Sequence, residues 1–171
     1  HLDTPIDFDN LLAEGSMMGS GGMIVMDEDD CMVSVARFYL DFTVEESCGK
    51  CTPCRIGNKR LLEILNKITE GRGSEKDLQT LSTLGQVIKD TALCGLGQTS
   101  PNPVLSTLNN FYDEYVKHVR EKTCRARQCK SLLTYTINPE LCIGCHLCFK
   151  HCPADAILGD VRKPHVINPD K

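Results

Sequence analysis

The sequence has 171 residues, of which 41% are hydrophobic and 25% are charged, as is ordinary for a globular protein. Its 19 Lys and Arg residues against 23 Asp and Glu residues give a net charge of -4, so the composition offers no basic surface for a nucleic-acid partner. No apolar run approaches the length that spans a bilayer, and no membrane span is predicted. The length permits one domain with a sizeable core or two small domains.

The 11 cysteines fall into clusters with metal-type spacing, and no signal peptide precedes them. An odd count in such clusters argues against a secreted disulfide framework and predicts a reducing, cytoplasmic compartment. The chain starts abruptly at His1-Leu2-Asp3 and stops at Asp170-Lys171. We therefore expect it to be a fragment of a longer polypeptide.

The N-terminal part contains a short predicted helix and a short apolar run. Residues 5–14 favour a helix that is opened by Thr4 and Pro5. Residues 22–26, Gly-Met-Ile-Val-Met, have the length of a strand. The glycines at 19–22 match neither the G-x-G-x-x-G nor the P-loop pattern, so we interpret them as a turn rather than as a phosphate site.

Residues 29–122 contain four predicted amphipathic helices. The first places apolar residues at i, i+3 and i+4 and delivers the chain to a cysteine run. The second extends from Cys54 to Gly71, the third opens with a capping box at Ser74, and the fourth begins at Ser100. Because short connections favour antiparallel neighbours, we predict a four-helix bundle.

Three cysteines lie between the first two predicted helices, in Cys48-Gly49-Lys50-Cys51-Thr52-Pro53-Cys54, and a lone Cys94 follows the third. A [4Fe-4S] cluster needs four thiolate ligands. Tetrahedral zinc sites usually pair two C-x2-4-C or Cys/His knuckles, so one tight run plus a remote cysteine favours iron-sulfur over zinc. We predict that Cys48, Cys51, Cys54 and Cys94 bind one [4Fe-4S] cluster at one end of the bundle.

A second cysteine run follows a charged boundary near residues 117–127 and a β-type run at 132–137. Cys142, Cys145, Cys148 and Cys152 have the C-x2-C-x2-C-x3-C-P spacing of bacterial ferredoxins. With a return strand around Val166 and Ile167, this segment predicts half of a ferredoxin-like domain with [4Fe-4S] ligands. The fourth cysteine of such a run ligates the other cluster in two-cluster ferredoxins, so we expect either a further cysteine run beyond Lys171 or a half-domain without intact clusters.

The residues Ser47-Cys48-Gly49-Lys50-Cys51-Thr52-Pro53-Cys54-Arg55 and Leu93-Cys94-Gly95-Leu96-Gly97 resemble a known cluster domain. It is the C-terminal domain of the NADH-binding flavoprotein subunit of respiratory complex I and of NAD(P)-linked [FeFe]-hydrogenases. Residues 4–11 and 15–28 are similar to the segment that precedes it, which ends a small ubiquitin-like (SLBB-type) domain. The resemblance implies a mainly α protein of four parts: 1–28, the end of the ubiquitin-like domain; 29–122, a four-helix iron-sulfur bundle; 123–137, a linker with a Cys pair; and 138–171, an incomplete α+β ferredoxin-like domain.

The resemblance also implies a function. FMN and NAD(P) sites would lie upstream of His1, and this chain would relay single electrons between the flavin and partner redox subunits. Those partners would be a thioredoxin-like 2Fe-2S subunit and a catalytic hydrogenase or equivalent subunit, with ferredoxin a further candidate. No nucleophile or general base with a recognisable partner is present, so no catalytic residue is predicted.

Three parent systems remain open on the sequence. The ferredoxin half after the bundle favours a multimeric [FeFe]-hydrogenase, because the respiratory flavoprotein generally ends soon after its bundle. The same module in complex I or in an NAD-linked formate dehydrogenase is the alternative. A structural zinc-binding interaction module without a redox role is the alternative of another class.

Cys124 and Cys129 belong to neither cluster motif. One interpretation is a pair of reduced thiols in a linker, and the other is a structural zinc site with a histidine as third ligand. His165 is the preferred histidine, because it lies on the predicted return strand outside the cluster loop. His118 is the reserve choice, and Cys31 is considered as a fourth ligand although it is far away in sequence.

Overall fold

The structure is a computed structural model in which residues 3–169 are described, and it divides into two compact units. The first unit spans His1–Leu132 and the second spans Leu133–Lys171. The outermost residues of the predicted end segments, 1–2 and 170–171, lie outside the described part. Each unit is considered by itself below.

The first unit is helical, which confirms the predicted mainly α class. Its elements in chain order are α1 (Phe8–Ala13), α2 (Met32–Glu45), the π-helix η1 (Pro53–Gly57), α3 (Asn58–Thr69), α4 (Glu75–Thr91), α5 (Gly95–Thr99), α6 (Asn102–Asn110), α7 (Tyr112–Val116), the π-helix η2 (Lys117–Glu121) and the 3-10 helix η3 (Lys130–Leu132). None of the helices described over residues 3–169 is both long and apolar enough to span a lipid bilayer.

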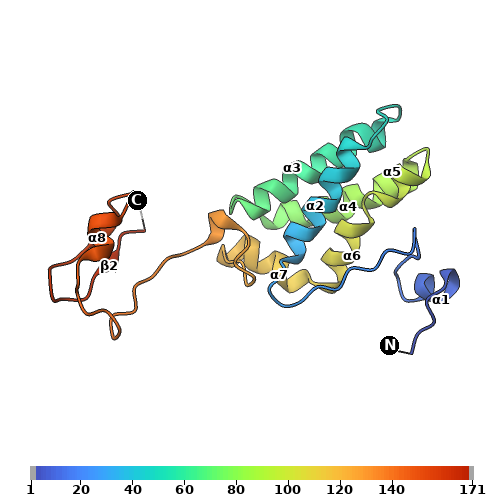
Figure 1. Ribbon diagram of the computed structural model, residues 1–171. Coiled ribbons are helices and arrows are strands. Elements are labelled where there is room, and N and C mark those ends of the chain that lie inside the picture. The colour runs from blue at the N-terminus through green and yellow to red at the C-terminus, as the bar shows by residue number, and fades with distance from the viewer. Residues whose placement is uncertain (1–2, 170–171) are drawn as a thin grey trace. The chain divides into compact units, whose positions relative to one another are not determined.

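Helices α2, α3, α4 and α6 pack on one another around a single apolar core. Helix α2 packs against α3 and α6, and α4 packs against the same two helices (Figure 1). Each helix contributes fully buried side chains, because its apolar residues recur with the helical period and share one face. The buried members of these four helices include Val33, Leu40, Leu61, Leu65, Leu81, Ile88 and Val104.

The predicted fourth helix is divided in the structure. Phe111 has φ -129° and ψ 35°, which are not helical values, so the chain turns between α6 and α7. The Tyr115 hydroxyl then lies 2.8 Å from the Thr107 hydroxyl and bridges the break, while the Tyr115 ring is fully buried. Residues 117–121 continue as a π-helix that ends at Lys122, whose φ is 53°. Sequence periodicity does not predict the break, because the apolar spacing continues through Phe111.

The N-terminal segment forms α1 with a side-chain cap. The Asp7 carboxylate accepts a 2.8 Å hydrogen bond from the Asn10 backbone N–H, as an N-cap residue should. The strand predicted at residues 22–26 does not form; the backbone there is irregular, and Met23 and Val25 are 77% and 84% exposed. A strand needs a hydrogen-bonded partner, and none pairs with this run in the described part of the chain.

The second unit contains a short helix and a two-stranded sheet. Helix α8 (Leu147–His151) is followed by β1 (Ile157–Leu158), which pairs antiparallel with β2 (Val166–Ile167). Ile157 lies opposite Ile167. The return strand at Val166 and Ile167 is therefore confirmed. The predicted β-type run at 132–137 is wrong as a strand, because Leu132 ends η3 and is buried in the core of the first unit.

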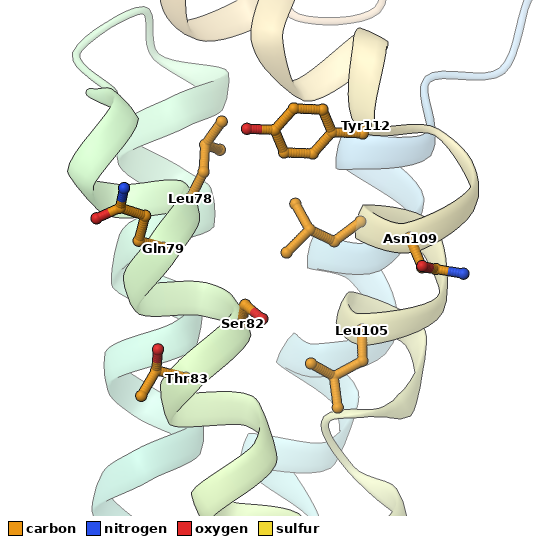
Figure 2. Close-up of a pocket in the computed structure, with 8 residues that line it drawn as sticks. Leu78, Gln79, Ser82, Thr83, Leu105, Asn109 and Tyr112 are labelled. Carbon is orange, nitrogen blue, oxygen red and sulfur yellow. The ribbon is translucent and has the colours of Figure 1, made fainter.

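A groove of about 530 Å³ lies between α4, α6 and the start of α7. Figure 2 shows the side chains of the two helices facing each other across it. Its lining residues are Leu78, Gln79, Ser82, Thr83, Leu105, Leu108, Asn109 and Tyr112. These residues include no cysteine, histidine or carboxylate, so the groove offers no ligand set for a metal.

Candidate metal centres

The two cysteine segments of the first unit lie at the same end of the helices (Figure 1). Cys48 and Cys51 follow the end of α2, Cys54 lies within η1, and Cys94 is the N-cap of α5. Gly49, between the first two ligands, has φ +73°, a left-handed conformation that glycine adopts at little cost. The π-helix η1 is an irregularity of the kind that often occurs at functional sites.

Contacts link the segment of Cys48, Cys51 and Cys54 to the segment of Cys94. A backbone hydrogen bond from Leu93 is the largest of the effects that lower the pKa of the Cys51 thiol, so Cys51 lies beside the residue that precedes Cys94. The Arg55 side chain donates a 2.9 Å hydrogen bond to the Gly49 carbonyl and closes the first loop on itself. The cysteine run and the remote cysteine are therefore neighbours in space.

Gly97 makes the close approach of α5 to η1 possible. A Cβ at this position would lie 3.2 Å from the Cys54 Cβ and 2.6 Å from the Ala92 Cβ. Only a residue without a side chain fits there. The donor set is four thiols, of which Cys54 is buried while Cys48 and Cys94 are exposed. Thiolates as sole ligands suit a [4Fe-4S] cluster, so the residues present fit that group.

Replacing Gly97 with Ala should push α5 away from Cys54. Overpacking of this kind costs about 1–3 kcal/mol, and we expect a matching loss of unfolding free energy together with reduced iron content. Denaturant unfolding and iron analysis measure both. Gly95→Ala is the matched control, because a Cβ at Gly95 would meet nothing within 4 Å. Equal stability of the two variants would contradict the packing role of Gly97.

In the second unit, backbone N–H groups point at two of the predicted ligands. The Ala156 N–H donates to Cys152 Sγ at 3.3 Å and lowers the pKa of that thiol. The His165 N–H donates to Cys142 Sγ at 3.4 Å. The other two predicted ligands, Cys145 and Cys148, are exposed. Hydrogen bonds from backbone amides to sulfur are a usual feature of iron-sulfur sites.

A third group of ligands is the most compact in the described part of the chain. Cys31, His118, Cys124 and Cys129 are all buried, and their ligand atoms lie within 4.8 Å of one another. Cys31 precedes α2, His118 lies in η2, and the other two cysteines follow η2. Cys31 Sγ lies 3.8 Å from Cys129 Sγ and 3.3 Å from His118 Nε2. Tetrahedral zinc with Zn–S bonds of about 2.3 Å places two sulfurs about 3.8 Å apart, so the spacing suits zinc.

The protonation state of this group also suits a metal. His118 Nδ1 lies 2.7 Å from the Glu114 carbonyl oxygen and donates to it, which leaves Nε2 facing the sulfurs. Metal-ligating histidines are usually held in this way. Hydrogen bonding from Cys129, with His118 close by, lowers the pKa of Cys31 to about 4. A lowered pKa favours the deprotonated sulfur, which is the form that binds a metal.

The histidine in this group is not the one that the sequence favoured. His165 lies in the second unit, where its Nε2 contacts His146 Nδ1 at 2.8 Å, and it is not a member of the group. His118, the reserve choice, supplies the imidazole, and Cys31 supplies the further thiol. Sequence reasoning ranked Cys31 only as a possible fourth ligand, because it is 98 positions from Cys129 and only packing brings them together. The one local signal was an isolated cysteine at the start of an amphipathic helix.

Comparison with known proteins agrees with the cysteine patterns. Residues 34–118 match the family model described as the NADH-ubiquinone oxidoreductase-F iron-sulfur binding region, and residues 135–158 match a 4Fe-4S binding domain. Both descriptions specify iron-sulfur binding, which confirms the expectation of [4Fe-4S] clusters.

Curated relatives include the NADP-reducing hydrogenase subunit HndC of Solidesulfovibrio fructosivorans, 61% identical over 164 residues, which are 96% of this chain and 34% of that protein. The F subunit of the NADH-quinone oxidoreductase of Mycobacterium bovis is 40% identical over 124 residues, which are 72% of this chain and 28% of that protein. The chain thus spans about a third or less of the length of these two relatives.

A solved structure of an NAD+-reducing [NiFe]-hydrogenase in the H2-reduced state is similar in fold. It aligns with a TM-score of 0.54 and 28% identity over 56% of this chain and 16% of that one. The cysteine spacing and the two family models both indicate iron-sulfur binding, and the fold agrees with them. The chain matches the C-terminal, iron-sulfur-binding part of the family of oxidoreductase subunits that contains HndC and the F subunit of NADH-quinone oxidoreductase.

Proposed function

We propose that this chain is the electron-transfer portion of an NAD(P)-linked flavoprotein subunit, relaying single electrons between a flavin and partner redox subunits of a multimeric [FeFe]-hydrogenase in the cytoplasm. The main support is that the two cysteine segments are in contact at one end of the helices. Cys51 lies beside Leu93, and Cys54 lies beside Gly97. The 61% identity to a subunit named as NADP-reducing hydrogenase supports the parent system.

Cys48, Cys51, Cys54 and Cys94 would hold one [4Fe-4S] cluster, and Cys142, Cys145, Cys148 and Cys152 would contribute to ferredoxin-type clusters. Such clusters supply one-electron transfer when bound. The work of this chain is to provide the thiolates and to direct N–H donors at them. Arg55, whose side chain bonds the Gly49 carbonyl, places a positive charge beside the anionic ligand set.

The proposal extends to the arrangement of the domains. Helices α2 to α7 would form the iron-sulfur bundle of residues 29–122, and residues 138–171 would be half of a ferredoxin-like domain. Residues 1–28 would end an SLBB-type domain whose remainder lies with the FMN and NAD(P) sites in a preceding part. The exposure of Ile6, Phe8 and Val25, at 69%, 70% and 84%, supports a covering partner for this segment.

We also propose that Cys31, His118, Cys124 and Cys129 hold a structural zinc ion. The burial of all four ligands, the 3.8 Å sulfur separation and the fixed His118 tautomer support this site. The ion would tie the start of α2 to the segment that leaves η2. Closed four-ligand zinc sites stabilise folds and leave no open position for chemistry.

The alternative parent is a respiratory NADH-quinone oxidoreductase, which the 40% identity to the F subunit of such an enzyme supports. The partners proposed for either parent are a thioredoxin-like 2Fe-2S subunit and a terminal redox subunit. Hydrogen-dependent reduction of NAD(P)+ by the complex purified from its native source separates the two. A complex that reduces quinone with NADH and does not oxidise hydrogen would contradict the hydrogenase assignment.

The redox proposal itself has a direct test. We expect the purified protein to be brown, with broad visible absorption that bleaches on addition of dithionite, because iron-sulfur clusters absorb and accept electrons. Iron and zinc are measured separately on the same sample. A colourless protein that contains zinc alone would contradict the electron-transfer role and would favour a structural interaction module.

A further inference from the structure

Asn58 is a polar residue without solvent-accessible surface, four positions after the cysteine ligand Cys54 and at the start of α3. Its amide Nδ2 lies 3.5 Å from Cys54 Sγ, within reach of a hydrogen bond to sulfur. Burying an amide without partners costs a few kcal/mol, about 1–3 by mutational data, so a buried asparagine needs its donors and acceptor satisfied. Cys54 is the partner that the structure provides for the amide nitrogen.

Ser100 fixes which way the Asn58 amide points. The Ser100 hydroxyl lies 2.9 Å from Asn58 Oδ1 and 2.9 Å from the Gly97 carbonyl, and it donates its proton between these two oxygens. Ser100 is only 2% exposed. With Oδ1 accepting from Ser100, the NH2 group faces the sulfur. The reverse orientation would set Oδ1 against an anionic thiolate, which is unfavourable because both are acceptors.

The Cys54 sulfur therefore lies beside two side chains that can donate hydrogen bonds to it. The Ser47 hydroxyl lies 3.2 Å from it on the other segment of the loop. Reduction of a cluster adds one negative charge that is spread over the iron and sulfur atoms. A donor aimed at a ligand sulfur stabilises the more negative state and raises the reduction potential. The effect is strongest where burial lowers the local dielectric.

We propose that Asn58, oriented by Ser100, is a positioning residue that raises the reduction potential of the cluster bound at Cys48, Cys51, Cys54 and Cys94. The inference rests on the proposed function, because it requires that cluster. The inference gives a role to Asn58 and Ser100, neither of which is a proposed ligand. The pair links α3 to the loop after α5, so it also holds the two ligand segments in register.

Replacing Asn58 with Leu removes the donor and keeps a side chain of similar size. A hydrogen bond to a charged group contributes about 1.5 kcal/mol, so we expect the ratio of reduced to oxidised cluster at a fixed potential to fall about tenfold. For a one-electron couple this is a downward shift of about 59 mV. Ser100→Ala leaves the donor in place but frees the amide, so a smaller shift in the same direction is expected.

The sign of the shift separates this role from a purely structural one. A site that is merely loosened admits water, and greater solvent exposure stabilises the added charge and raises the potential. Asn66→Leu is the matched control. Asn66 lies on the same helix, eight residues and about 12 Å further along, where its amide oxygen contacts Arg37. Its replacement should leave the potential unchanged.

The experiment is a redox titration of the intact, cluster-loaded protein, followed by electron paramagnetic resonance. The relevant resonance is identified as the one that disappears in Cys94→Ala. A lower potential in Asn58→Leu with unchanged iron supports the inference, and an unchanged or higher potential overturns it. If Asn58→Leu loses iron, the Ser100→Ala variant is titrated instead. A lower potential in that variant supports the inference, and an unchanged or higher potential overturns it. If the wild-type protein has no Cys94-dependent resonance, both the proposed cluster and this inference are wrong. If the resonance is present but its potential does not change in Asn58→Leu, only this inference is wrong.

Discussion

Replacement of Cys94 by Ala is expected to remove or convert one [4Fe-4S] cluster. The other three proposed ligands, Cys48, Cys51 and Cys54, would each bind a different iron, and none could take a second position. Loss of the cluster would lower iron by about four atoms per chain, and conversion to a three-iron cluster would lower it by about one. Iron analysis with resonance spectra of the reduced and oxidised protein measures either outcome.

Leu93→Ala is the control for this experiment. Leu93 is 82% exposed and reaches Cys51 through its backbone, which the substitution retains. Iron content should therefore match the wild type. Full iron occupancy with an unchanged spectrum in Cys94→Ala would refute the assignment of Cys94 as a ligand.

Loss of the proposed zinc site is expected to have the largest effect on stability. The His118→Ala variant should bind less than one zinc per chain, and its first unit should lose about 4 kcal/mol or more of unfolding free energy, as is usual when a structural metal is lost. Chelation of the wild-type protein should give a similar loss. Zinc content and denaturant unfolding measure the two effects on the same sample.

Two further variants make the zinc experiment decisive. His165→Ala should retain zinc, because His165 contacts His146 and is not a member of the buried ligand group. Arg125→Ala should also retain it, since Arg125 is a neighbour of Cys124 that contributes only an exposed pairing with Glu114. Zinc lost from His165→Ala and kept in His118→Ala would reverse the ligand assignment.

The local patterns of this sequence predict most of the helices in the first unit. The third predicted helix, α4 in the structure, begins where the capping residues indicate. The Asp77 carboxylate accepts a 2.7 Å hydrogen bond from the Ser74 N–H. The run from Cys48 to Cys54 lies in one loop, because three ligands at fixed short spacing need no tertiary information. Membership of the iron-sulfur family likewise follows from short motifs, and the family models confirm it.

What sequence reasoning could not supply depends on packing between distant segments. Cys31 and His118 are 87 positions apart, and they meet only because the start of α2 lies against η2. His165 was preferred because it lies on the return strand outside the cluster loop, whereas the structure places its Nε2 beside His146 Nδ1. The burial of Asn58 could not be predicted either. A polar residue beside an apolar stripe is expected at the surface, and only the fold shows that Ser100 lies next to it.

Helix α2 joins the two proposed metal centres of the first unit. Its N-cap is Cys31, and Cys48 follows its C-cap, Glu46, by two residues. Each residue of an α-helix rotates the chain by about 100° and advances it by about 1.5 Å. Inserting or deleting a single residue within α2 would turn one ligand out of its centre, whichever end stayed fixed. The two proposed centres together would therefore fix the 14-residue length of α2, while leaving its exposed residues free to vary.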